Sequence, residues 1–224
     1  GAVKYPYPEY LYDRNPFNDV KYLWNRQVLL DYCLRPIAER EPTDLSSIYA
    51  TTWEDELYYT LDWILNHYEE PEAVGEETPG DAFLADTGRN LQSELLPYID
   101  AHPETEFVFF YPPYSVLFWH DVVRENHLEA TLEQSAYLAE ELLSRDNVRV
   151  FFFQDIEELV SDIDGGYMDE IHFRPAVNRY MVSCFASGEQ EVTSGAAFRD
   201  RLLRLRDIIS DFEAVGAPAL LGAG

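Results

Sequence analysis

FVFFY, at residues 107–111, is the stretch that decides the fold class, and VRVFFF at residues 148–153 repeats its pattern. Both are short, rich in aromatic or β-branched residues and bounded by turn-forming residues, which is typical of strands in a parallel sheet. Between them, residues 131–145 predict a helix that Thr131 caps, with Gln134 completing a capping box. This order predicts an α/β fold in which helices flank a parallel sheet.

Apolar residues at helical spacing predict further helices on both sides of these strands. The expected ranges are 18–36, 53–68, 89–99, a helix from Val116 onward, one opened by Pro175, and 196–212 with Ser194 as its cap. Residues 69–81 are acidic, contain proline and glycine and lack periodicity, so we expect a surface loop there. The visible strands are too few for a complete sheet, which indicates that further strands belong to it.

Composition restricts the class of partner. The 224 residues are 46% hydrophobic, which is enough for a sizeable core. The net charge is −26, from 16 basic and 42 acidic residues, and such a field repels phosphate backbones, so we expect no nucleic-acid binding. No apolar run approaches the roughly 20 residues that span a bilayer, so we expect no membrane span within the chain.

Metal and disulfide chemistry also receive little support. Cys33 and Cys184 lie far apart among apolar neighbours, which favours two free thiols over a disulfide. The histidines at 67, 102, 127 and 172 are scattered without ligand spacing, so we expect no metal and no cofactor.

Asp169 and His172 form the most suggestive pair, in YMDEIHFRPAVNRYM at residues 167–181. Ligands of open α/β sheets bind beyond the carboxyl ends of the strands, and this segment follows the second strand. A histidine acting as general base needs its Nδ1–H held so that Nε2 can take a proton, and a carboxylate three residues earlier can hold it. The same spacing also fits a polar turn capped by the aspartate, so both readings stay open.

MDEIHFRPAVNRYM at 168–181, with FVFFYPPYSVLFW at 107–119, resembles the C-terminal part of the SGNH/GDSL hydrolase superfamily. More narrowly, the chain is similar to bacterial SGNH-like proteins related to cell-envelope acyl-transfer proteins, and residues 7–25 resemble a segment of that group. The resemblance implies a flavodoxin-like sheet, with Asp169 as the orienting acid and His172 as the base of a Ser-His-Asp triad. It also implies that Asn178 hydrogen-bonds the loop.

The superfamily's serine nucleophile has no counterpart here. It lies in a Gly-Asp-Ser or Gly-x-Ser block, whereas the candidates in this chain are Ser46, Ser47, Ser115 and Ser194. Ser115 follows two prolines at a strand end but lacks the glycine-flanked elbow that exposes a nucleophile. We therefore expect residues 1–215 to be the C-terminal portion of a single SGNH-like domain whose serine lies upstream, and 216–224 to be a flexible tail.

Four residues after the first strand are candidates for substrate binding: Tyr111, Tyr114, Ser115 and Trp119. Amphipathic rings stack on sugars and still form hydrogen bonds, although core packing explains the same aromatic residues equally well. His120 beside Asp121 has two readings, a surface or half-buried helix histidine and a catalytic one.

Two functions follow. The first is a serine esterase or O-acyltransferase that acts on acylated envelope glycans, at an extracytoplasmic location that the resemblance alone implies. The alternative is a non-catalytic SGNH-like module that binds a carbohydrate or a partner. The sequence indicates no oligomeric state, and without the nucleophile we expect this chain alone to be inactive.

Overall fold

The computed structural model of the chain describes residues 30, 34–35 and 58–222. The chain divides into two units, Gly1–Thr52 and Trp53–Gly224, and the sheet lies in the second. Most of the predicted helix over 18–36 lies outside the described residues. So do Cys33, Ser46, Ser47 and the segment 7–25.

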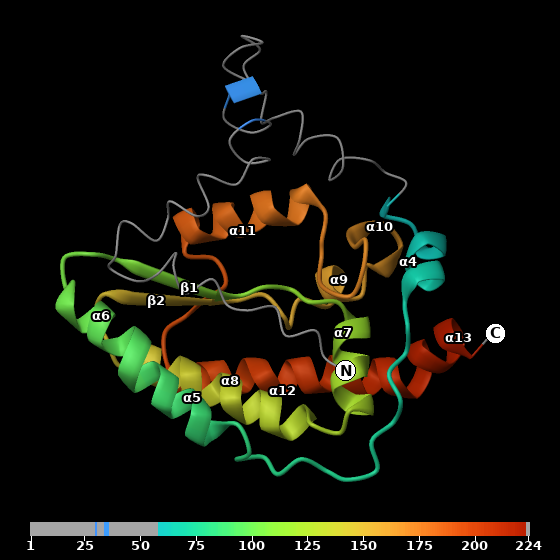
Figure 1. Cartoon of the computed structure of the whole chain (residues 1–224), viewed down its shortest axis with the longest axis horizontal. Coiled ribbons are helices and arrows are strands. Elements are labelled where there is room, and N and C mark those ends of the chain that lie inside the picture. The colour runs from blue at the N-terminus through green and yellow to red at the C-terminus, as the bar shows by residue number, and fades with distance from the viewer. Residues whose placement is uncertain (1–29, 31–33, 36–57, 223–224) are drawn as a thin grey trace. The chain divides into compact units, whose positions relative to one another are not determined.

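The two predicted strands pair in parallel (Figure 1). Their register runs from Phe107 opposite Val148 to Tyr111 opposite Phe152. The strands are β1 (Phe107–Tyr111), β2 (Val148–Phe152) and β3 (Glu191–Val192), in the order β1-β2-β3. The α/β class is therefore confirmed, but the sheet is mixed, because β3 is antiparallel to β2. At two residues β3 is too short to show alternation, so the sequence did not reveal it.

Helices surround the sheet (Figure 1). In chain order they are α4 (Leu61–His67), α5 (Leu84–Asn90), the π-helix η4 (Leu91–Leu95), α6 (Leu96–Ala101), α7 (Val116–Arg124), α8 (Leu128–Leu143), α9 (Glu157–Val160), α10 (Ile163–Gly166), α11 (Pro175–Ser187), α12 (Gly195–Asp211), the π-helix η5 (Phe212–Gly216) and α13 (Ala217–Leu221). In Figure 1, α11 lies on one side of the strands and α8 and α12 lie on the other.

The alternation of β2 builds this layering. Successive side chains of a strand point to opposite faces. Val150 and Phe152 therefore join the large core cluster with α8 and α12, whereas Phe151 packs on the other face with Met181 and Cys184 of α11. Cys184 is a buried free thiol. Each large apolar side chain buried in this way contributes about 1.5–3 kcal/mol.

The strand β1 is buried on one face only. Val108 and Phe110 are 39% and 45% exposed, while the residues between and beside them are half-buried. The two strands therefore differ: β2 is covered on both faces, whereas one face of β1 stays exposed.

The predicted capping box of the crossover helix is wrong. α8 begins at Leu128, one turn before Thr131, with His127 as its N-cap residue. The Thr131 hydroxyl donates to the carbonyl of His127, and the Gln134 amide reaches across to Thr87 of α5. Both side chains therefore have partners other than the backbone N–H groups that a capping box would satisfy.

Other helix ends follow their local signals. Ser194 caps α12 as predicted, since its hydroxyl accepts the N–H of Ala197. α4 begins only at Leu61, because the Thr60 hydroxyl accepts the N–H of Trp63 and makes Thr60 the cap. Residues 69–81 form no helix or strand, as predicted.

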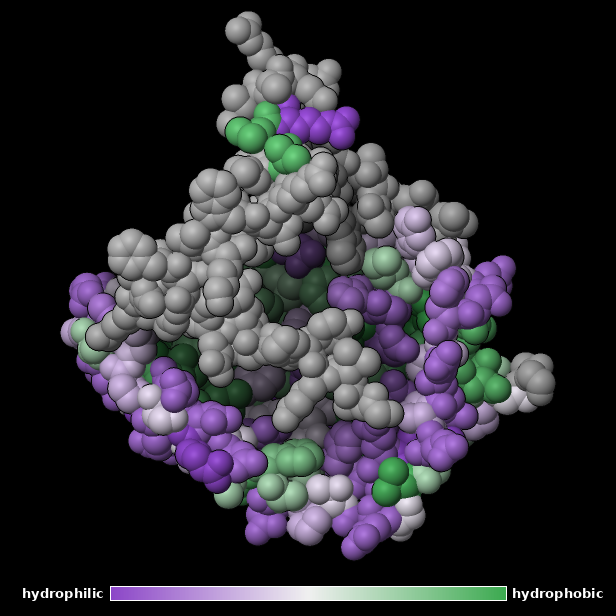
Figure 2. All heavy atoms as spheres, in the orientation of Figure 1, coloured by the Kyte–Doolittle hydropathy of each residue, from purple (hydrophilic) through white to green (hydrophobic). Residues whose placement is uncertain are grey.

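The expected flexible tail over 216–224 instead includes α13. Ala217 is buried, and Leu220 and Leu221 pack against the apolar cluster formed by α4, α7, α9 and α10. Burial of these side chains stabilises a short segment that its small-residue composition did not predict. Hydrophilic residues cover much of the described periphery on the face shown in Figure 2, in keeping with the acidic composition.

Candidate functional site

A tight hairpin over residues 166–174 carries Asp169 and His172. Tyr167 and Phe173 form an antiparallel bridge at its base. The N–H of Met168 donates to the carbonyl of His172, 2.9 Å away. Pro175 then opens α11, because its fixed φ suits the first helical turn. Asp169 and His172 therefore lie on either side of a two-residue tip.

The Asp169 carboxylate binds the imidazole and the hairpin backbone together. Its Oδ2 lies 2.6 Å from Nδ1 of His172. Its Oδ1 accepts the N–H groups of Ile171, at 2.9 Å, and His172, at 2.7 Å. An ionised carboxylate can only accept, so Nδ1 carries the proton in this contact. The backbone bonds are those of a capped turn, and the ring bond adds the orientation that a general base needs.

Two groups after β1 anchor this hairpin. The backbone N–H and the hydroxyl of Ser115 both donate to the carbonyl of Glu170, at 3.0 and 2.7 Å. The buried hydroxyl of Tyr167 donates to the carbonyl of Pro113. The loop after β1 and the Asp169–His172 hairpin are thus adjacent, as expected at the carboxyl edge of parallel strands.

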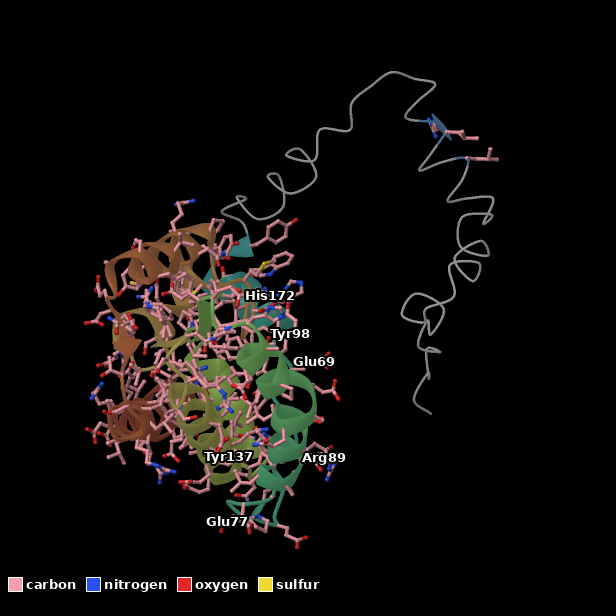
Figure 3. The ribbon with its side chains drawn as sticks, turned by 90° about the vertical axis from the view of Figure 1, so that its left-hand side faces the viewer. Glu69, Glu77, Arg89, Tyr98, Tyr137 and His172 are labelled. Atoms are coloured by element: carbon pink, nitrogen blue, oxygen red, sulfur yellow. The ribbon has the colours of Figure 1, made fainter. Side chains whose placement is uncertain are left out.

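His172 opens onto a surface hollow of about 390 Å³. Its described lining consists of Ile171, His172, Phe173, Pro175 and Asn178. The His172 side chain is 50% exposed, and Figure 3 shows it well apart from Glu77 and Arg89. The apolar part of the lining suits a small apolar group beside the imidazole.

The acidic side chain of Asp121 lies near Glu170 of the hairpin. The Tyr68 hydroxyl donates to Asp121, 2.5 Å away. Burial raises the pKa of the Asp121 carboxyl above its ordinary value, and the negative charge of Glu170 adds to this rise. Arg174 lies with its guanidinium 5.0 Å from the ring centroid of Tyr59. The field around Asp121 and Glu170 disfavours an anionic ligand.

The four residues predicted to bind substrate do not gather around His172. Tyr111 belongs to the core, where its hydroxyl donates to the carbonyl of Ser135 and burial raises its pKa. Trp119 is 2% exposed in the same cluster. Tyr114 packs against Phe118. Ser115 is fully buried and contacts the hairpin rather than the hollow.

Sequence reasoning passed over most of the hollow's lining. Ile171, Phe173 and Pro175 flank the histidine, but no pattern distinguishes them from residues of any apolar turn. Asn178 lies six residues after His172, in the first turns of α11, and that helical placement brings its side chain to the same hollow.

His120 forms a second cluster, on α7. It is buried, with Nδ1 lying 2.7 Å from Glu213 and Nε2 lying 3.0 Å from Glu70. Glu70 also lies 3.5 Å from Arg124. His120 and the two carboxylates, together with residues of α13 and Gly222, line a hollow of about 320 Å³. The acidic loop after α4, expected to be solvated, thus supplies one of the two carboxylates.

Clustered metal ligands or a long apolar helix would point to other kinds of site. Within residues 30, 34–35 and 58–222, no cluster of three or more His, Cys, Asp or Glu side chains is placed to hold a metal ion. Over the same residues, none of the helices has the length and apolar character needed to cross a bilayer.

Comparisons with protein-family models, curated proteins and solved structures found no match to this chain.

Proposed function

We propose that the Asp169–His172 pair is the acid–base half of an SGNH-type serine esterase or O-acyltransferase that acts outside the cytoplasm on acylated envelope glycans. One observation carries the proposal. The imidazole is held through Nδ1 by a carboxylate whose other oxygen is fixed by two backbone N–H groups, at the carboxyl edge of two parallel strands. The flavodoxin-like sheet and the location are part of the proposal, and both rest on the motif resemblance.

Nε2 of His172 is the nitrogen that would exchange protons in such a reaction, because Asp169 occupies Nδ1. A serine outside this chain attacks the acyl carbon, and its hydroxyl proton passes to Nε2. Asp169 stabilises the imidazolium that forms. The same proton then passes to the leaving alkoxide, and water or a glycan hydroxyl takes up the acyl group in the second half of the cycle.

The hollow beside His172 supports this assignment. Ile171, Phe173 and Pro175 give it an apolar wall for a small acyl group, and Asn178 offers an amide to a polar part of the substrate. The acidic surroundings favour a neutral sugar ester over a phosphorylated substrate.

The test is aryl-ester hydrolysis by the protein with its upstream sequence in place. We expect a serine-directed phosphonate to inhibit it and His172→Ala to lower kcat by about 10²–10⁴-fold. Asp169→Asn should act in the same direction. The matched control is His102→Ala, because His102 is an exposed histidine beside Glu104. Phosphonate inhibition combined with an unchanged rate in His172→Ala would show that His172 is not the base.

The second candidate is a non-catalytic module that binds a carbohydrate or a partner. Its support is the state of Ser115, the serine at the strand edge, whose hydroxyl is committed to the carbonyl of Glu170. The upstream gene sequence separates the two candidates. A Gly-x-Ser block after a hydrophobic strand favours the enzyme, and the lack of such a block favours the module.

A further inference from the structure

The hydroxyl of Ser115 has a use that neither a nucleophile nor a helix cap explains. Ser115 is fully buried at the start of α7, and its N–H and Oγ both donate to the carbonyl of Glu170. Glu170 lies inside the hairpin tip, between Asp169 and His172. We infer that Ser115 is a positioning residue, which sets the orientation of the Asp169–His172 pair.

A rigid peptide unit connects Ser115 to that pair. The carbonyl of Glu170 and the N–H of Ile171 belong to the same planar peptide bond, so fixing one fixes the other. That N–H donates to Oδ1 of Asp169, at 2.9 Å, and Oδ2 of the same carboxylate holds the imidazole. The orientation of one peptide plane therefore passes from the Ser115 hydroxyl to the histidine ring.

The bond does little for the helix on which Ser115 lies. A serine at an N-cap ordinarily accepts an N–H of the first helical turn. The Ser115 hydroxyl makes no such capping bond and instead reaches a carbonyl 55 residues further along the chain. Removing the hydroxyl should consequently affect the hairpin more than α7.

A second anchor keeps the hairpin attached without Ser115. The hydroxyl of Tyr167, at the hairpin base, donates to the carbonyl of Pro113. The backbone N–H of residue 115 also stays on the Glu170 carbonyl, so losing the hydroxyl removes one of two bonds to it, which loosens the peptide plane at the tip and leaves the fold in place. The hydrogen bonds that lead from Ser115 through the Glu170–Ile171 peptide to Asp169 do not depend on catalysis. Their value for proton transfer rests on the proposed function.

The test is amide hydrogen exchange by NMR on the full 224-residue chain with Ser115→Ala. We expect the amides of Ile171 and His172 to exchange roughly five- to tenfold faster, which is the effect of losing one neutral hydrogen bond. The Nδ1 proton of His172 should also exchange faster with water, a change that a general loss of stability would not confine to this ring. Amides of β2 should keep their rates.

Ser144→Ala is the matched control, because the Ser144 hydroxyl also donates to a carbonyl, that of Glu141, at the same distance of 2.7 Å. It should leave the hairpin amides unchanged. Unchanged hairpin amides in Ser115→Ala would overturn the inference. Should Ser115→Ala fail to fold, Ser115→Cys keeps a similar volume with a weaker donor, and wild-type exchange at the hairpin in that variant overturns it equally.

The outcome is separable from that of the proposed function. In the active protein, we expect Ser115→Ala to lower kcat with KM unchanged. If the hairpin amides respond to Ser115→Ala while His172→Ala leaves hydrolysis intact, the positioning geometry stands and the hydrolase assignment fails. If His172→Ala abolishes hydrolysis while the amides do not respond, only the role of Ser115 fails.

Discussion

Two histidines in this molecule contact carboxylates through Nδ1 at nearly the same distance, 2.7 Å in His120 and 2.6 Å in His172. Their surroundings differ. The His120 side chain is 6% exposed and has a second carboxylate on Nε2. The His172 side chain is 50% exposed beside a hollow, and its carboxylate comes from the same turn.

The difference in exposure suits different roles: the enclosed His120 fits a fixed charge, whereas proton transfer by the exposed His172 is the proposal made above. Each nitrogen of His120 faces an acceptor-only carboxylate, so both contacts are hydrogen bonds only in the imidazolium form. Burial lowers the pKa of His120, but the bonds to Glu70 and Glu213 outweigh it, so the net pKa is raised. We infer that His120 is a cross-link, which joins the loop after α4 and the helix η5 to α7.

The largest expected effect on stability comes from His120→Gln. Glutamine is neutral and can donate to only one of Glu70 and Glu213, so both carboxylates lose their charged donor and one of them loses its hydrogen bond to residue 120. We expect the free energy of unfolding at pH 6 to fall by about 2 kcal/mol in urea titrations. The control His102→Gln, at an exposed histidine, should change it by less than about 0.5 kcal/mol. Equal losses in the two variants would contradict the cross-link.

The stability contribution of His120 should depend on pH. Its folded pKa lies above the ordinary value of 6.5, so the contribution is complete below that pH and is lost as the pH rises through the folded pKa. The pKa of Glu70 is lowered from 4.5, first by its bond to His120, so this carboxylate adds stability above pH 4.5. The difference in free energy of unfolding between wild type and His120→Gln should be largest between pH 4.5 and pH 6.5. It should decrease toward pH 9. A difference that does not change with pH would show that protonation of His120 does not contribute to stability.

How far the sequence predicts these features depends on how local their causes are. The first and last residues of β1 were predicted correctly, because a short aromatic run bounded by turn residues indicates where such a strand begins and ends. The Asp169–His172 contact was also within reach, since the partners are three residues apart. The partners of His120 are 50 and 93 residues away. No local pattern indicates such a contact, so the two readings of His120, a surface or half-buried helix histidine and a catalytic one, did not include these partners.

The same reasoning explains the aromatic residues after β1. Tyr111 and Trp119 are residue types that sugar-binding loops often contain. Residue type, however, does not determine which face of a strand or helix a ring occupies. In the structure both rings pack in the core under α8 and α12. Position along a strand is local information, whereas the face that becomes buried depends on the helices that pack there.

A smaller effect should distinguish the two carboxylates of the cross-link. The Glu213 side chain is 28% exposed and lies closer to the imidazole than Glu70, which is 42% exposed. We expect Glu213→Gln to lower the free energy of unfolding by about 1 kcal/mol at pH 6. Glu70→Gln should lower it by less, because water screens that pair more strongly. The reverse order, measured in the same urea titrations, would place the main contact of His120 on the loop rather than on η5.

The smallest change in stability should come from His172→Gln. This variant removes the ring contact with Asp169 but leaves the backbone N–H groups of Ile171 and His172 on the same carboxylate. Because the pair is half-exposed, we expect a loss of about 0.5 kcal/mol or less. Ester hydrolysis by the protein with its upstream sequence should nevertheless be lost, while His120→Gln should retain it at a temperature where that variant is folded. If His172→Gln instead destabilises the chain as much as His120→Gln, the contact between His172 and Asp169 is structural. The proposed difference in role, stability for His120 and proton transfer for His172, would then be wrong.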